Sequence, residues 1–295
     1  MKKKSGSGAV VVGAAAVIVV GGGVFAIAQD WKTGHNSLVD YARAEMGDAE
    51  LQYQFGQKEL KNTSMTASPE KARVWFEKSA KNGYVPAMMT LGDTYNTSSA
   101  KRDGDAACHW YEEAARKGNA EGMRNIGLCH QIGRGSLAPD DRPATEWFRK
   151  AAEKGDLPAH GLLAARLFRE GKDAEALEWL KKADAAGSLE ATEMLGDYYY
   201  SPYTPNRDVN KAFGYFAKAA EGGITGAQRS YSFCFFAGKG TAKDGAEAYK
   251  WAVIAQKSGD KDAVTAINFL KPQLSAAQIA EGEKRADAWL ASHKR

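Results

Sequence analysis

The sequence predicts an all-α fold, a right-handed solenoid of stacked antiparallel helix pairs with an N-terminal hydrophobic leader helix. A frame of alanine, an aromatic residue three positions later and a glycine eight positions after that recurs six times. The closing glycines are Gly83, Gly118, Gly155, Gly187, Gly223 and Gly259. They follow one another at intervals of 35, 37, 32, 36 and 36 residues, a period typical of helical repeats. An uncharged run, Ala9–Ala28, precedes the repeats.

The uncharged run follows the basic cluster Lys2–Lys4 and has two interpretations. As an anchor, about 20 apolar residues would span the ~30 Å hydrocarbon layer of a membrane. As a signal peptide, Ala26–Ala28 would supply the small residues that precede cleavage before Gln29. Both interpretations export the rest of the chain. We therefore expect a periplasmic protein, tethered to the inner membrane by this helix or released if it is cut.

The repeats divide the chain into four predicted segments. These are an anchor or signal peptide (1–28), a linker with an N-terminal capping helix (29–47), six repeats with one incomplete unit (48–270) and a C-terminal capping helix (271–295). Ser275 and Gln278 match a capping box that opens the last helix. Terminal caps are expected because a stack of repeats otherwise exposes an apolar stripe at each end.

The second helix of each repeat, helix B, ends at the closing glycine. Fifteen residues before that glycine stand Ser68, Asp103, Asp140, Lys172, Asp208 and Asp244. All but Lys172 are residue types that favour a helix N-cap. Ala248, Trp251 and Ala255 show the helical spacing that predicts one buried stripe. The glycine then ends the helix as a C-terminal cap.

The first helix, helix A, begins just after a glycine. The predicted caps are Asp48, Asn119, Asp156, Ser188 and Asp260. Apolar or small residues follow at four, eight and twelve positions after the glycine, as in Ala191, Leu195 and Tyr199. A glycine or alanine follows the leucine position, as in Gly196, and is expected to let a neighbouring backbone approach. Each helix pair therefore needs its neighbours to bury its stripes.

These residues resemble the Sel-one-like repeats (SLR), relatives of the tetratricopeptide repeat. The matching segments are Leu195–Tyr199, Lys211–Glu221, Gly133–Gly135 and Gly238–Gly240. The resemblance implies a non-catalytic scaffold that binds another protein in the bacterial cell envelope. Some such proteins serve surface-polysaccharide export or assembly, and others resemble immunity proteins that neutralise injected effectors. An immunity protein is the more specific expectation, and an adaptor for polysaccharide export is an alternative.

Catalytic and cofactor-binding patterns are weak in this sequence. Ser98–Lys101 and Ser258–Lys261 match a short serine–lysine pattern of penicillin-recognising enzymes but lack its companion motifs. An enzyme that acts on cell-wall or β-lactam material is therefore the alternative from another class, and we expect no enzyme. The five histidines have no metal-ligand spacing, so no metal or cofactor is expected. Without the three leader lysines, 37 basic residues face 36 acidic ones, which predicts no nucleic-acid partner.

The three cysteines allow one predicted disulfide. Cys108 and Cys129 lie at equal distances from the Gly118–Asn119 turn, so an antiparallel helix pair would bring them to the same level. An oxidising compartment would permit the bond. The alternative is that both are small core residues.

Aromatic residues outside the repeating stripes mark the predicted partner-binding surface. Most lie ten or thirteen residues after a glycine, where helix A turns away from its stripe. The candidates are Phe168, Tyr198, Tyr200, Tyr203, Phe233 and Phe236. The early repeats carry polar residues at these positions, such as Asp93, Asn96 and Gln131. Aromatic side chains anchor many interfaces. The alternative is that they pack against the adjoining repeat.

Overall fold

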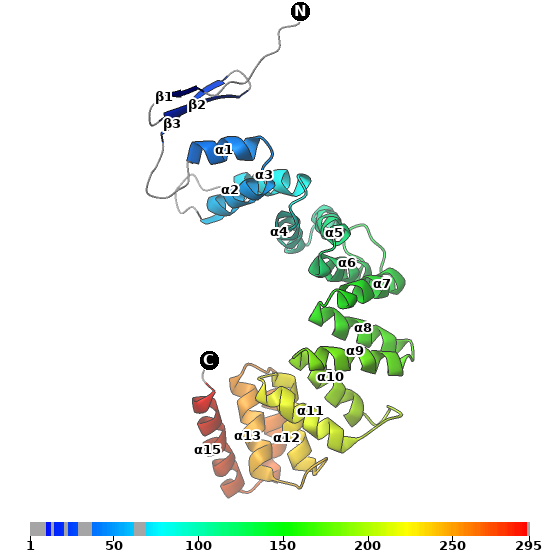
Figure 1. The fold of residues 1–295 in the computed structure, drawn as a ribbon. Coiled ribbons are helices and arrows are strands. Elements are labelled where there is room, and N and C mark those ends of the chain that lie inside the picture. Colours follow the sequence, from blue (N-terminus) through cyan, green and yellow to red (C-terminus); the bar gives the residue numbers. More distant parts are fainter. Residues whose placement is uncertain (1–9, 13–14, 21–22, 29–36, 62–68, 294–295) are drawn as a thin grey trace, which may run out of the picture. The chain divides into compact units, whose positions relative to one another are not determined.

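The computed structural model describes residues 10–12, 15–20, 23–28, 37–61 and 69–293. The chain forms two compact units, Met1–Ala144 and Thr145–Arg295, which we describe separately. Figure 1 labels their helices and strands. The lysine cluster Lys2–Lys4, the position of Gln29 and the predicted cap Ser68 lie outside the described residues.

The first unit contains the helices of the early repeats. They are α1 (Ser37–Glu45), α2 (Ala49–Lys61), α3 (Pro69–Lys81), α4 (Val85–Asn96), α5 (Lys101–Arg116), α6 (Ala120–Ile132) and the start of α7 (Asp141–Glu153). Each helix from α1 to α5 packs against the next one in the chain, and α2 with α3 and α4 with α5 form closely packed pairs. The helix pairs predicted from the repeat period are therefore present.

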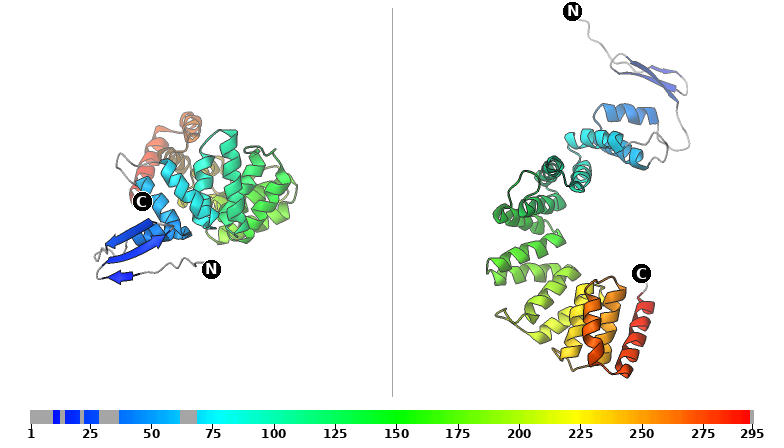
Figure 2. Two further views of the ribbon diagram at one scale, coloured as in Figure 1. Left: turned by 90° about the horizontal axis from the view of Figure 1, so that it is seen from above. Right: turned by 180° about the vertical axis from the view of Figure 1, so that it is seen from behind.

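The second unit continues the same alternation. Its helices are α8 (Leu157–Arg169), α9 (Asp173–Ala185), α10 (Leu189–Tyr200), α11 (Val209–Glu221), α12 (Thr225–Ala237), α13 (Gly245–Lys257), α14 (Ala263–Leu270), the short 3₁₀ helix η1 (Lys271–Gln273) and α15 (Ala276–Ser292). The last helix lies along α13, as the right view of Figure 2 shows. Its N-terminus carries the expected capping box of Ser275 and Gln278. In both units, the fold class of the repeat region is an all-α helical-repeat solenoid.

The predicted leader helix is not found among the described residues of the run 9–28. The described residues of this stretch form three antiparallel strands, β1 (Val10–Val12), β2 (Ala15–Val20) and β3 (Gly23–Ala28), in the order β1-β2-β3. Val10 pairs with Val17, and Ala15 pairs with Ala28. The stretch is rich in β-branched valine and isoleucine, which favour strands over helices. None of the helices in the described part of the chain combines the length and hydropathy needed to cross a membrane.

Polar caps and glycines set the ends of the repeat helices. The side chains of Asn119, Asp156 and Ser188 accept N-terminal backbone N–H groups of α6, α8 and α10, as expected. All six period-defining glycines adopt positive φ angles, between 87° and 100°, which only glycine adopts readily. Asp103 and Asp260 are exceptions among the predicted caps. Helix α5 begins earlier, at Lys101, with Ala100 as its N-cap, and α14 begins later, at Ala263, with Asp262 as its N-cap.

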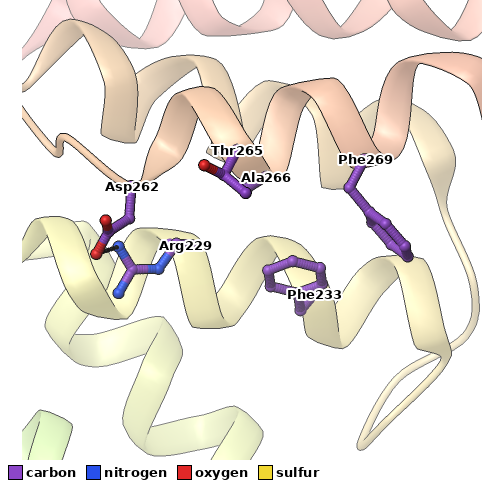
Figure 3. A pocket seen from close by; sticks show the side chains of 6 residues that line it. All are labelled: Arg229, Phe233, Asp262, Thr265, Ala266 and Phe269. Carbon is purple, nitrogen blue, oxygen red and sulfur yellow. Dashed lines mark hydrogen bonds and ion pairs between the residues drawn. The ribbon is translucent and has the colours of Figure 1, made fainter.

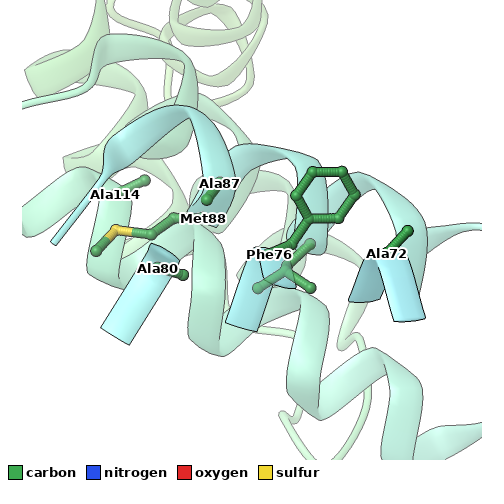
Figure 4. Packing of buried hydrophobic residues seen from close by; sticks show 7 residues of the cluster. Ala72, Phe76, Ala80, Ala87, Met88 and Ala114 are labelled. Atoms are coloured by element: carbon green, nitrogen blue, oxygen red, sulfur yellow. The ribbon is translucent and has the colours of Figure 1, made fainter. Parts of the chain in front are cut away.

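The buried stripes follow the predicted spacing. The frame alanine is buried in all six repeats, with at most 1% of its surface exposed. Around α3 and α4, the core contains Ala72, Phe76, Ala80, Ala87 and Met88 (Figure 4). The rings and methyl groups of one helix therefore fill the space beside the small residues of the next.

The aromatic residue of the frame is not the deepest side chain in most repeats. Phe76 and Phe148, one position later, are 3% and 0% exposed, whereas Trp75 and Trp147 are half-buried. Lysine ammonium groups lie 4.4 Å from the ring centroids of these two tryptophans. Positions three and four residues after an alanine share one helix face, so the frame alone does not decide which side chain goes inside. Trp251 is buried, and the indole of Trp289 from α15 packs against it.

Candidate functional site

Three of the predicted partner-binding aromatics line one pocket in the second unit. Phe168 lies at the end of α8, Tyr198 in α10, and Tyr203 in the loop after α10. The pocket has a volume of about 470 Å³ and is also lined by Met194, Asp173 and Asp197. We call it the acidic aromatic pocket. It joins residues from two successive repeats.

Ring stacking and hydrogen bonds hold the acidic aromatic pocket together. The ring centroids of Phe168 and Tyr198 are 5.1 Å apart, with their planes at 17°. The Tyr198 hydroxyl donates to Asp173 Oδ2 at 3.1 Å, and Thr204 Oγ1 donates to the Tyr198 carbonyl at 2.8 Å. Tyr198 is buried, whereas Tyr203 is 94% exposed. The pocket therefore has a packed wall and one free aromatic ring at its rim.

A second pocket, of about 480 Å³, lies between α12 and α14. It is lined by Phe233, Phe269, Ala266, Thr265, Arg229 and Asp262 (Figure 3). The Phe269 ring contacts Phe233 and Phe236, with centroids 5.9 and 5.5 Å apart. At the other end, Arg229 Nη1 lies 2.7 Å from Asp260 Oδ2 and 3.2 Å from Asp262 Oδ2. The cation in this pocket is thus already paired.

Tyr200 joins neither set of pocket residues. Its ring makes an edge contact with the fully buried ring of Phe216 on α11, with centroids 5.9 Å apart. Burial raises the pKa of the Tyr200 hydroxyl above its usual value. Of the six predicted residues, Phe168, Tyr198 and Tyr203 are therefore brought together, Phe233 and Phe236 form a second group, and Tyr200 packs within the helix pair. Whether any of them contacts a partner stays a prediction.

Two carboxylates lie on α10 on the side that faces α12. The pKa of Glu193 is raised to about 6, first by burial and then by the nearby charge of Asp197. Desolvation by surrounding atoms also raises the pKa of Asp197, although the residue is exposed, and the charge of Arg229 opposes this shift. Gly226 of α12 leaves room for Glu193, because a Cβ atom there would clash with the carboxylate. The helix A surface of this unit thus combines aromatic rings with partly desolvated acids.

The prediction from sequence missed Phe269, Asp173 and Asp197. Phe269 stands ten residues after Gly259, so extending the same spacing into the incomplete seventh unit would have found it. Asp197 stands ten residues after Gly187. In the sequence, an acid at that position cannot be distinguished from an ordinary solvent-exposed acid. Asp173 belongs to helix α9, and only the packing of α9 beside α10 brings it to the pocket.

The first unit has a more polar surface at the equivalent positions. A pocket of about 430 Å³ is lined by Asp93, Asn96, Tyr111 and Arg134, among others. The Tyr111 hydroxyl donates to Asp93 Oδ1 at 2.8 Å, and burial followed by this bond raises the pKa of Tyr111. The polar group at position 93 thus holds a core tyrosine in place.

Cys108 of α5 and Cys129 of α6 form a disulfide in the structure, with 2.12 Å between the sulfur atoms. Their Cα atoms are 6.0 Å apart, within the usual range for disulfides. Cys234 is a buried free cysteine, and burial raises the pKa of its thiol to about 11. The antiparallel arrangement of α5 and α6 therefore brings the two sulfur atoms together.

The serine–lysine pairs lie at helix ends. Ser98 Oγ accepts the backbone N–H of Ala100 just before α5, and Ser258 caps the C-terminus of α13. Among the described residues, no group of three or more histidine, cysteine or acidic side chains could hold a metal ion. The stacked helices instead present surfaces of half-buried aromatic and charged side chains.

Tandem helix pairs with aromatic pockets on their A helices define a helical-repeat interaction scaffold. The chain belongs to the Sel1 repeat family, which it matches at residues 41–84, 85–119, 120–156, 164–188, 189–224 and 225–260. The resemblance seen in the sequence is thereby confirmed. Sel1 repeats mediate contacts between proteins, so the expected protein-interaction role holds at this level.

Solved and curated relatives share this repeat. A protective antigen of uropathogenic Escherichia coli with an SLR fold is 26% identical, with a TM-score of 0.74, and the match covers 85% of this chain and 55% of that one. An uncharacterised protein of Neisseria meningitidis is 30% identical over 44% of this chain and 28% of its own length. Chitin synthase regulatory factor 3 of Schizosaccharomyces pombe is 30% identical over 30% of this chain and 10% of its own length. The chain thus spans a minor part of the two curated relatives.

Proposed function

We propose that this Sel1 repeat scaffold binds its protein partner through the aromatic pockets of its second unit. The proposal rests on two groups of aromatic side chains. One pocket is lined by Phe168, Tyr198 and Tyr203, and another by Phe233 and Phe269. Interfaces concentrate their binding energy in a few aromatic anchors. The pocket volumes, about 480 and 470 Å³, are large enough to admit side chains of a partner.

Capture of the partner from envelope extract tests this proposal. We expect the full chain with Tyr203→Ser, Phe233→Ser and Phe269→Ser to lose capture while its thermal unfolding curve stays close to that of the wild type. Tyr203 and Phe269 are 94% and 49% exposed, so their replacement removes little core. Ile132→Ser, which removes an exposed apolar side chain from the first unit, is the matched control. Undiminished capture by the folded triple variant would refute the proposal.

We further propose that the protein acts in the bacterial cell envelope. The disulfide between Cys108 and Cys129 supports this location, because such bonds persist in oxidising compartments. Cell fractionation with alkylation of free thiols before lysis provides the test. We expect the oxidised protein in the periplasmic or membrane fraction, and a reduced protein in the cytoplasmic fraction would contradict the proposal.

A toxic effector injected by a neighbouring cell is the more specific partner that we propose. A protein partner and an exported location are both requirements of an immunity scaffold, and the aromatic pockets would supply the contact. Production of this chain should restore growth to cells that express the captured partner in the periplasm. Growth arrest that persists despite capture would favour an adaptor role, such as polysaccharide export or assembly.

A further inference from the structure

The acidic aromatic pocket differs from the second pocket in its charge. The charged side chains that line it, Asp173 and Asp197, are both carboxylates. The second pocket contains a cation, Arg229, together with the acid Asp262. Both pockets have aromatic walls and similar volumes. They therefore select different chemistry despite their equivalent places on the A helices.

Among the described residues, no lysine or arginine lines the acidic aromatic pocket beside its two acids. The positive charge of Arg229 acts on Asp197 and lowers its pKa. The guanidinium itself forms ion pairs with Asp260 at 2.7 Å and with Asp262 at 3.2 Å. Asp173 accepts one hydrogen bond, from the Tyr198 hydroxyl, through Oδ2. Lys172, the neighbour of Asp173 in sequence, is bonded to Glu170 at 2.7 Å. A ligand that carries a positive charge would therefore complement the pocket.

The walls restrict the shape of that cation. Phe168 and Tyr198 form a stacked aromatic wall, and Tyr203 stands almost fully exposed at the rim. Aromatic faces attract cations, and the flat guanidinium of arginine stacks on them better than the compact ammonium of lysine. Its five N–H donors also suit a pair of carboxylates.

We propose that the acidic aromatic pocket binds an arginine side chain of the partner protein. This inference rests on the proposed protein-binding function and assigns the chemistry of one contact. The guanidinium would lie against the rings of Phe168 and Tyr203 and donate to the carboxylates of Asp173 and Asp197. Since Tyr203 belongs to the loop between α10 and α11, its ring can meet the arginine from the solvent side.

A short peptide provides a direct test on the full chain. The probe is acetyl-Ala-Arg-Ala-amide, and the control is the same peptide with citrulline, which keeps the shape of arginine but has no charge. Met194 lines the pocket and is one of seven methionines, so a ¹³C-methyl label on methionine reports binding by NMR. Met194→Leu identifies its signal. We expect saturable shifts of this signal with the arginine peptide and binding of the citrulline peptide that is about tenfold weaker or worse.

Single substitutions show which side chains of the pocket bind the arginine peptide. Tyr203→Ala and Asp197→Asn alter exposed residues, and each should weaken the arginine peptide about fivefold. Phe233→Ala in the second pocket should leave the affinity unchanged. Equal binding of the two peptides, or full affinity in both Tyr203→Ala and Asp197→Asn, would overturn the inference. Neither result would change the outcome of the partner-capture test with the triple variant. Failure of the arginine inference can therefore be distinguished from failure of the proposed protein-binding function.

Discussion

Gly196 of α10 faces the ring of Phe216 of α11 so closely that a Cβ atom on the glycine would lie 2.7 Å from Phe216 Cδ1. The same relationship links Gly56 with Phe76, where the nearest distance would be 2.5 Å. The glycine nine residues after the glycine that precedes helix A thus receives an aromatic ring from helix B of its own repeat. The sequence had predicted the approach of a neighbouring backbone at this position, and the structure replaces that backbone with a ring.

Replacement of Gly196 by alanine should therefore destabilise the protein. Overpacking typically costs about 1 to 3 kcal/mol, and the better helix propensity of alanine returns up to about 1 kcal/mol. We expect a net loss of about 1 to 2 kcal/mol in urea unfolding. Gly214→Ala is the matched control, since nothing lies within 4 Å of a Cβ atom at that helical position. The control should be neutral or stabilising, and equal effects of the two changes would contradict the explanation.

Replacement of Phe148 and of Trp147 distinguishes the contributions of the two neighbouring aromatic positions of the repeat to stability. Phe148→Ala should reduce the free energy of unfolding by about 3 to 5 kcal/mol, as expected for a fully buried ring. Trp147→Ala should cost less, about 1 to 2 kcal/mol, because part of the indole is exposed to solvent in the folded protein. Thermal or urea unfolding of the two variants measures the difference. A larger loss for Trp147→Ala would mean that the tryptophan anchors the core.

Glu193 should make stability depend on pH between about 4.5 and 6. Its pKa rises from the ordinary 4.5 to about 6 in the folded state, so folding favours the protonated acid. The resulting stabilisation is present at low pH and is lost as pH rises through about 6. The charged groups that act on it are Asp197, Glu190, Asp260 and, with opposite sign, Arg229.

Glu193→Gln measures this contribution. The amide cannot ionise, so the variant should gain on the order of 1 kcal/mol over the wild type at pH 7.5, allowing for solvent screening. The difference should shrink when unfolding is repeated at pH 4. Glu178→Gln, an exposed acid on α9, is the control and should leave the pH profile unchanged. A constant difference at both pH values would rule out the titration of Glu193 as the cause.

The disulfide should be visible as a thiol count. Protein unfolded without reductant should react at one thiol, Cys234, and at three thiols after reduction. The sequence separation of 21 residues predicts a loss of about 3 kcal/mol when Cys108 and Cys129 are both changed to serine. Three reactive thiols before reduction would show that the bond is absent in the isolated protein.

The sequence by itself determined the repeat, its helix pairs and the residues that end them. A buried alanine, a polar cap and a positive-φ glycine act within one or two turns of a helix, so their spacing records the local structure directly. The same reasoning found the closing helix α15 through Ser275 and Gln278. It failed for Ala9–Ala28, because an apolar run rich in β-branched residues is compatible with both a helix and strands.

Only the tertiary structure decided which aromatics meet and which charged side chains share a pocket. Phe168 reaches Tyr198 and Phe233 reaches Phe269 because successive A helices lie side by side, and no local spacing specifies those pairs. Arg229 pairs with Asp260, and Asp173 and Asp197 are the charged side chains that line the acidic aromatic pocket. The burial of Phe148 in place of Trp147 has the same origin. Helix periodicity allows both side chains to face inward, and the space left by the neighbouring helix admits only one of them.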